Sequence, residues 1–93
     1  MPYIVLFTDN STASPELRAK HMEDHLSFLA AHSDTVVAAG PLETEAGAGD
    51  GGMWLVEADT MAEVERLIRE DPFWSTGLRH SHRVLAWRQV FAR

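Results

Sequence analysis

Residues 52–72 have the sequence GMWLVEADTMAEVERLIREDP, and this segment decides the fold because it places a strand directly before a capped helix. Its first part, Gly52 to Ala58, is rich in bulky apolar residues and predicts a strand. Thr60 and Glu63 form a capping box, whose side chains satisfy free backbone amides at the start of a helix. The box predicts a helix from Met61 to Glu70, which must stop just before the proline that closes the segment.

The residues before this segment predict another strand and another helix. Tyr3 to Thr8 (YIVLFT) contains the β-branched and aromatic residues typical of a strand. Ser14 is suited to cap a helix, and Pro15 is suited to its first position because its fixed φ is already helical. We expect this helix to reach about His32 and a second strand to cover Thr35 to Gly40 (TVVAAG).

The remaining segments complete the order of elements. We expect Gly40-Pro41 to end the second strand. Glu43 to Gly52 (ETEAGAGDGG) is too acidic and glycine-rich to bury much apolar surface, so we expect a mobile loop there. His82 to Phe91 predicts the last strand. The order β-α-β-β-α-β, in a single domain of residues 1–93, is typical of a ferredoxin-like α+β fold, a four-stranded antiparallel sheet with two helices on one face.

Both faces of the predicted sheet are apolar. In the first strand Tyr3, Val5 and Phe7 point one way, whereas Ile4 and Leu6 point the other way. Because two helices cover only one face, a second copy of the chain is the natural cover for the other, which predicts a homodimer. In the alternative, these short strands are simply apolar in composition and stay partly exposed.

Composition and charge exclude several classes of function. The chain has 93 residues, a formal net charge of −6 and no cysteine. An excess of acids without a basic cluster argues against a nucleic-acid partner. No apolar run approaches the roughly 20 residues that a membrane span requires, and the N-terminus lacks the pattern of a secretory signal. We therefore expect a cytoplasmic protein, with which the lack of cysteine is consistent.

Histidines gather on one stripe of the first predicted helix. At about 100° per residue, His21, His25 and His32 fall on its core-facing side, where a purely structural design would use Leu or Ala. A buried neutral imidazole needs a hydrogen-bond partner, so the stripe predicts a polar site. In the alternative, each histidine lies at the helix edge and reaches solvent or a backbone carbonyl. His21 and His25 have the i,i+4 spacing of metal ligands, but we expect no metal because a third ligand is not evident.

Asp71 lies at the end of the helix that the capping box begins. A carboxylate beside the negative end of the helix dipole is unfavourable for stability. An Asp-Pro pair commonly starts a turn, and this gives a purely structural reason for the residue. In the predicted topology, however, the first helix and the end of the second lie side by side over the sheet. Asp71 can therefore orient an imidazole and hold its tautomer.

Three short blocks follow one another along the chain: His25 to Leu29 (HLSFL), Ala39 to Leu42 (AGPL), and Asp71 to Phe73 (DPF) with Gly77 after it. Together they resemble the signature of the YciI-like (YCII-related) family, in the same order and at similar spacing. The resemblance covers nearly the whole chain. It implies a ferredoxin-like subunit, a dimeric α/β barrel, and a His–Asp pair in a cleft.

Carried over by motif, the catalytic pair that the family implies is His25 and Asp71. Arg18, seven residues before His25, is similar to a basic position of the family and is expected to bind an anion. We predict acid/base chemistry of the lyase or hydrolase type, in which His25, oriented by Asp71, moves a proton on a small aromatic or carbonyl-bearing substrate. No cofactor is expected. The residues expected to bind the substrate are Arg18, His21, Phe28, Trp54 and Phe73. The aromatic members of this set are equally suited to an ordinary core.

Two other kinds of function fit the same residues. In a non-catalytic binding module, His25 supplies a hydrogen bond to a ligand and no turnover occurs. The second alternative, which rests on analogy of fold alone, is a cofactor-independent oxygenase or an accessory subunit. Oxygen consumption with a quinol substrate would identify the oxygenase, and co-purification with an enzyme would identify the accessory subunit.

Overall fold

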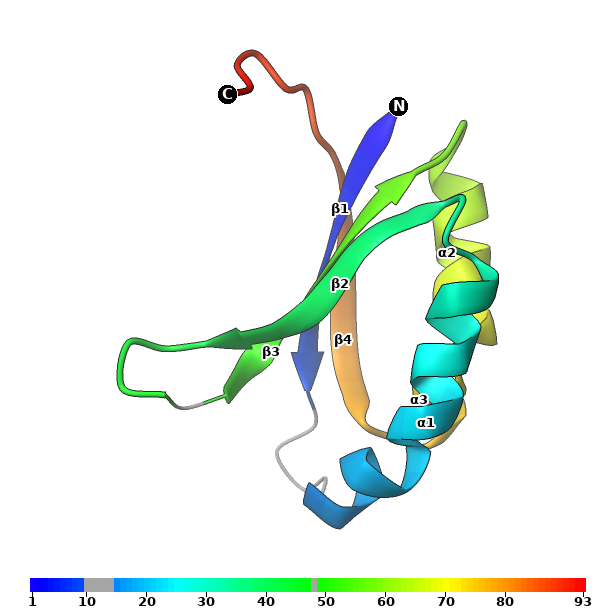
Figure 1. Cartoon of the computed structure of the whole chain (residues 1–93), viewed down its shortest axis with the longest axis vertical. Helices are drawn as coiled ribbons and strands as arrows, with labels where there is room; N and C mark the ends of the chain where they lie inside the picture. The colour runs from blue at the N-terminus through cyan, green and yellow to red at the C-terminus, as the bar shows by residue number, and fades with distance from the viewer. Residues whose placement is uncertain (10–14, 48) are drawn as a thin grey trace.

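The computed structural model of the chain describes residues 1–9, 15–47 and 49–93. Its elements are, in order, β1 (Pro2–Asp9), α1 (Pro15–Ala31), β2 (Val36–Glu43), β3 (Gly49–Glu57), α2 (Met61–Glu70), α3 (Pro72–Ser75) and β4 (Arg79–Ala86). The strands form one antiparallel sheet in the order β2-β3-β1-β4. All three helices lie on the same side of this sheet (Figure 1). This confirms the predicted ferredoxin-like α+β fold.

The capping box sets the start of α2 as predicted. The backbone N–H of Glu63 donates to the Thr60 hydroxyl at 3.2 Å, and the Glu63 carboxylate accepts from the backbone N–H of Asp59 at 3.1 Å. The helix ends at Glu70 because the next residue, Asp71, adopts an extended backbone with φ −65° and ψ 133°. The one-turn helix α3 that follows was not predicted from the sequence.

The helix α1 begins and ends within a residue of the predicted bounds. The Ser14 cap predicted for it lies outside the described residues. Its last turn continues into a turn in which the backbone N–H of His32 donates to the carbonyl oxygens of Phe28 and Leu29, at 3.2 and 3.1 Å.

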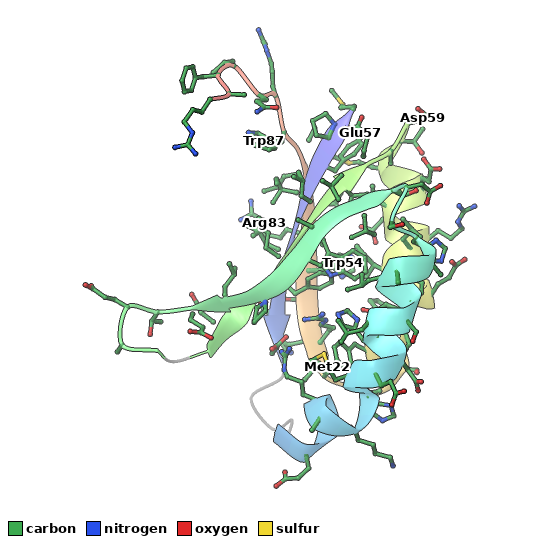
Figure 2. All side chains as sticks on the ribbon, viewed as in Figure 1. Met22, Trp54, Glu57, Asp59, Arg83 and Trp87 are labelled. Atoms are coloured by element: carbon green, nitrogen blue, oxygen red, sulfur yellow. The ribbon has the colours of Figure 1, made fainter. Side chains whose placement is uncertain are left out.

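The hydrophobic core lies between the sheet and the helices. As the alternation of apolar residues predicts, one face of β1 and β3 is buried under α1 and α2, and the indole of Trp54 lies on this inner side (Figure 2). The residues of the buried cluster are Tyr3, Val5, Phe7, Val36, Trp54, Val56, Ala58, Val64, Leu67 and Ile68.

The second strand does not end at Gly40, which corrects the prediction. It continues to Glu43, with Pro41 opposite Gly52 of β3. Because β2 is an edge strand, the missing N–H of a proline costs it no hydrogen bond on the open side.

The long loop predicted for residues 43–52 is also shorter than expected. Gly49 to Gly51 belong to β3, and Glu43 pairs with Gly49 across the hairpin. Gly51 has φ +81°, and a Cβ atom there would overlap the carbonyl oxygen of Phe7. The glycines that predicted a loop therefore allow β3 to approach β1 closely. The mobility expected for the rest of the hairpin stays a prediction.

The last strand lies earlier in the chain than predicted. It covers Arg79–Ala86 instead of His82 to Phe91. Its pairing ends because its partner β1 begins at Pro2, whose carbonyl oxygen accepts the last hydrogen bond, from the backbone N–H of Trp87, at 2.9 Å. Val90 and Phe91, which the prediction placed in the strand, are 88% and 82% exposed.

The outer face of the sheet is apolar and is covered by no helix in the described part of the chain. Ile4 and Leu6 of β1 and Met53 and Leu55 of β3 are half-buried side chains on this face. Arg83 of β4 projects from the same side in Figure 2. Among the described residues, no helix has both the length and the apolar character to cross a membrane.

Candidate active site

His25 and Asp71 meet under the sheet, as predicted from the sequence. His25 of α1 is 7% exposed and Asp71 is 3% exposed. The imidazole Nδ1 lies 2.7 Å from Oδ1 of Asp71. The same oxygen also accepts from the backbone N–H of Phe73 at 3.3 Å, because Asp71 caps the start of α3. The carboxylate is therefore held at the junction between α2 and α3, where Asp71 ends one helix and caps the next.

This contact determines the tautomer of a neutral His25. An ionised carboxylate only accepts hydrogen bonds, so Nδ1 must be the donor. The other ring nitrogen, Nε2, then carries a lone pair and is available to accept a proton. The arrangement matches the first requirement of a general base, which is an oriented imidazole with one free nitrogen.

Two aromatic side chains lie beside the imidazole ring. Phe73 is stacked on His25 with 4.2 Å between ring centroids, and Trp54 lies on a nearly parallel plane at 6.5 Å. Both aromatic residues are buried in the core. The stacking of Phe73 and the hydrogen bond to Asp71 together favour the observed orientation of the ring.

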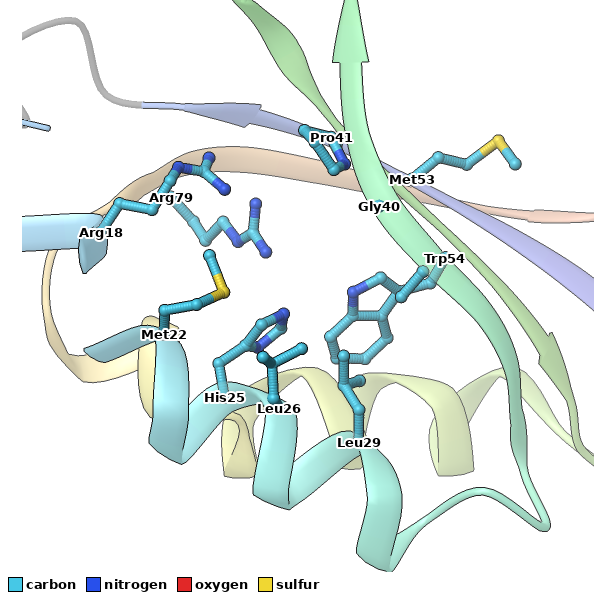
Figure 3. A pocket seen from close by; sticks show the side chains of 12 residues that line it. Arg18, Met22, His25, Leu26, Leu29, Gly40, Pro41, Met53, Trp54 and Arg79 are labelled. Atoms are coloured by element: carbon cyan, nitrogen blue, oxygen red, sulfur yellow. The ribbon is translucent and has the colours of Figure 1, made fainter. Parts of the chain in front are cut away.

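A pocket of about 110 Å³ opens beside this ring, between α1 and the strands β2 and β3. Figure 3 shows His25 projecting from α1 into it, with Arg18 and Arg79 on one side and Trp54 and Leu29 on the other. The lining residues are Arg18, Met22, His25, Leu26, Leu29, Ala39, Gly40, Pro41, Gly52, Met53, Trp54 and Arg79. The two sequence blocks of α1 and β2 that carry the family resemblance therefore form opposite walls of one pocket.

The arginine end of the pocket is held together by Asp9, the last residue of β1. One carboxylate oxygen accepts from Nη2 of Arg18 at 2.6 Å and the other accepts from Nη1 of Arg79 at 3.2 Å. Burial lowers the pKa of the Arg79 guanidinium, and the carboxylates of Asp9 and Asp71 oppose that shift. The Arg79 guanidinium also lies over the ring of Phe7, 4.1 Å from its centroid.

Sequence reasoning missed Asp9 and Arg79. Asp9 follows the first predicted strand, which ends at Thr8, and Arg79 precedes the last predicted strand, which begins at His82. Their contact joins residues 70 positions apart, and it follows from the pairing of Asp9 with Arg79 in the sheet. A correct start for β4 would have placed the two side by side.

The five residues predicted to bind substrate are placed differently from one another. Arg18 and Trp54 line the pocket. In the described part of the chain His21, Phe28 and Phe73 do not line it. Phe73 lies behind the imidazole, and Phe28 packs against the core with its ring 6.4 Å from that of Trp54. His21 is half-buried on α1.

A metal site is not formed by the histidines of α1. Among residues 1–9, 15–47 and 49–93, no three His, Asp or Glu side chains lie close enough together to bind an ion. His32 lies against Phe28 with 4.6 Å between ring centroids, away from His25.

A second histidine–carboxylate pair lies between β4 and α2. Nε2 of His82 is 2.8 Å from Oε2 of Glu65. His82 contacts the edge of Trp74 and lines a separate pocket together with Trp74, Arg79, His80 and Ser81. This pair was not predicted from the sequence.

The fold and the pocket together define a ferredoxin-like domain with a buried His–Asp pair at the side of a small, mainly apolar cavity. The YCII-related domain matches residues 1–88, and the chain belongs to this family. No protein of curated function matches the chain.

One solved structure with this fold is 5-chloro-2-hydroxyhydroquinone dehydrochlorinase from Burkholderia phenoliruptrix AC1100, in complex with 2,5-dihydroxybenzoquinone. It is 24% identical in sequence with a TM-score of 0.80, and the match covers 95% of this chain and 94% of that chain.

Proposed function

We propose that the protein is a small-molecule enzyme in which His25, oriented by Asp71, removes or donates a proton on a bound substrate. The observation that carries this proposal is the 2.7 Å contact between Nδ1 of His25 and the buried Asp71 carboxylate at the wall of a pocket. His82 of the His82–Glu65 pair also lines a pocket, so the deeper burial of Asp71 and its second hydrogen bond are what set His25 apart. A general base needs both the oriented ring and room for a substrate.

The chemistry of the step follows from the tautomer. Nε2 takes a proton from an acidic C–H or O–H of the substrate, and the imidazolium that forms is stabilised by the Asp71 carboxylate. The imidazolium then returns this proton to the product or to a leaving group, which gives a lyase reaction without a cofactor. In a hydrolase, Nε2 would instead take the proton from a water molecule that attacks the substrate, and the leaving group would receive that proton. The apolar wall formed by Met22, Leu29 and Trp54 keeps water away and strengthens these electrostatic contacts.

The expected substrate is a small, flat molecule with a carbonyl or hydroxyl group. The pocket is narrow, and the indole of Trp54 and the side chain of Leu29 offer it an apolar surface. The dehydrochlorinase of the same fold is bound to a dihydroxybenzoquinone, which supports a ligand of this type. We do not extend its chlorinated substrate to this chain, because the two proteins share only 24% of their residues.

The experiment that tests this proposal measures deuterium exchange, because proton abstraction is visible even where no net reaction follows. The protein is incubated in D₂O with a panel of small hydroxyaromatic and carbonyl compounds that includes 2,5-dihydroxybenzoquinone. Carbon-bound protons are followed by ¹H NMR. We expect the wild-type protein to accelerate exchange in at least one compound, and the variants His25→Asn and Asp71→Asn to lose that acceleration. The matched control His82→Asn should retain it.

Two results would count against proton transfer. If compounds bind the pocket, seen as shifts of the Trp54 indole signal, but none exchanges or turns over, the protein is a non-catalytic binding module. If exchange occurs equally in wild type and His25→Asn, the base lies elsewhere.

We also propose that the outer face of the sheet is covered by a second copy, which gives a homodimer. Ile4, Leu6, Met53 and Leu55 form a contiguous apolar surface on paired strands, and such a surface suits a self-complementary interface. Replacing Leu55 by Glu removes apolar area from that interface and buries a charge in it, so the variant should sediment as a monomer at micromolar concentration. Met61→Glu, on the exposed side of α2, is the control and should remain dimeric. A wild-type monomer in the same experiment would overturn the proposal.

A further inference from the structure

Arg79 combines deep burial with incomplete hydrogen bonding. Its side chain is 7% exposed, and its Nη1 bonds one oxygen of Asp9. Its Nε is buried and has no hydrogen-bond partner among the residues that the structure describes. A guanidinium has five N–H donors, and leaving them unsatisfied away from water is costly. Because Nε itself is inaccessible, a ligand in the pocket lined by Arg79 would contact the terminal Nη atoms of this guanidinium.

The charges around Arg79 favour a ligand with one negative charge. Arg18 and Arg79 share the single carboxylate of Asp9, which leaves one positive charge in excess in this group of three. Asp71 also acts on Arg79, and its negative charge balances this excess, while its Oδ1 accepts hydrogen bonds from His25 and the backbone of Phe73. A monoanion therefore adds one negative charge to a balanced group and a dianion adds two, which favours the monoanion.

The guanidinium of Arg79 points into the pocket (Figure 3) and packs against two aromatic rings. In Figure 3 the Arg79 side chain extends into the pocket toward the His25 ring. The ring of Phe7 lies under it at 4.1 Å, and the ring of Phe73 at 5.3 Å. Gly52 makes room at the pocket floor, since a Cβ atom there would lie 3.4 Å from Nη1 of Arg79.

We propose that Arg79, with Arg18 beside it, forms a subsite that binds the carboxylate of a small planar monoanion, whose remaining atoms extend toward His25. The planar fork of an arginine matches the two oxygens of a carboxylate better than it matches a single alkoxide. This proposal rests on one part of the proposed function, namely that the pocket beside His25 binds the ligand. It adds that the substrate is a carboxylic acid, and that Arg79 determines this specificity.

The test uses benzoate as the probe and benzamide as its neutral isostere. Because Nε of Arg79 is buried, its N–H exchanges slowly with water and gives an observable ¹H–¹⁵N signal, which Arg79→Lys identifies by its loss. We expect benzoate to shift this signal in the wild-type protein and benzamide to leave it in place. Arg79→Gln should weaken benzoate binding roughly 10- to 100-fold, whereas the control Arg66→Gln, on the exposed side of α2, should bind as the wild type does.

The outcome for the subsite is separate from the outcome for the proposed function. Benzoate that binds His25→Asn as well as wild type supports the subsite, even if no compound exchanges deuterium. An unmoved Arg79 signal at saturating benzoate, or equal benzoate affinity in wild type and in folded Arg79→Gln, would overturn it whatever the exchange experiment shows. If Arg79→Gln does not fold, the wild-type titration alone decides.

Discussion

The two histidine–carboxylate pairs of this domain have nearly the same length and very different surroundings. Nδ1 of His25 is 2.7 Å from Asp71, and Nε2 of His82 is 2.8 Å from Glu65. The side chains of the first pair are 9% and 2% exposed, and those of the second are 17% and 36% exposed. Distance alone therefore does not distinguish a functional pair from a surface contact. Burial and a second donor to the carboxylate distinguish them here.

The aromatic neighbours of the two pairs differ in the same way, although both come from α3. The ring of Phe73 is fully buried and stacked on His25, whereas the partly exposed Trp74 touches His82 with its edge. The ring of His25 is therefore stacked on a fully buried ring, whereas the ring of His82 is held by Glu65 in a more exposed site. We expect the pairs to respond differently to matched substitutions.

The largest difference is expected in activity. Replacing His25 by Ala or Asp71 by Asn removes the base or its correct tautomer, and should lower proton exchange or turnover by roughly 10²- to 10⁴-fold. The proposed dimer should not be affected, because neither change removes much apolar core. His82→Ala and Glu65→Gln should stay within about twofold of wild type. His32→Ala should also have a small effect, since His32 lies away from His25. Comparable losses in both pairs would contradict the distinction drawn between them.

A second difference is expected in stability. Asp71→Ala removes the cap of α3 and leaves the ring nitrogen of His25 and the backbone amide of Phe73 without an acceptor, so unfolding should become easier by roughly 2–4 kcal/mol. Glu65→Ala breaks a partly exposed pair and should cost less than about 1 kcal/mol. Urea unfolding at one protein concentration measures both, because the stability of the proposed dimer would depend on concentration. Equal costs would show that the buried pair adds nothing beyond a surface contact.

The smallest difference is expected for the aromatic neighbours. Phe73→Leu leaves a gap beside the imidazole and should destabilise the fold by about 1–2 kcal/mol, with reduced activity because the ring is no longer held. Trp74→Leu should change stability by less than about 0.5 kcal/mol and leave activity unaltered. The same urea and exchange experiments apply. A larger effect at Trp74 than at Phe73 would reverse our assignment of the two pairs.

Local signals allowed part of the fold to be predicted. The bounds of α2 follow from Thr60, Glu63 and Pro72, which act within a few residues of the chain. The bounds of β4 depend on which residues of β1 remain to be paired, and this contact is not local. The prediction therefore placed the last strand too late. In the same way, the continuation of β2 through Pro41 depends on its position at the edge of the sheet.

The candidate site was predictable to a similar extent. The helical stripe, the topology and the family resemblance together predicted a contact between His25 and Asp71, and the structure contains this contact. The cluster of Asp9, Arg18 and Arg79 was not predicted, because its residues come from three elements that only the folded sheet and α1 bring together. An arginine at the start of a strand has no sequence feature that distinguishes a buried cation from a solvated one.

The tautomers of the two histidines test the central claim most directly, and they need no substrate. His25 is bonded through Nδ1 and His82 through Nε2, so a long-range ¹H–¹⁵N spectrum of the neutral rings should show the Nδ1–H tautomer for His25 and the opposite, Nε2–H tautomer for His82. Asp71→Asn should remove the preference at His25 and leave that at His82 unchanged. An Nε2–H tautomer for His25 in the wild-type protein would leave no lone pair facing the pocket and would contradict its assignment as the base.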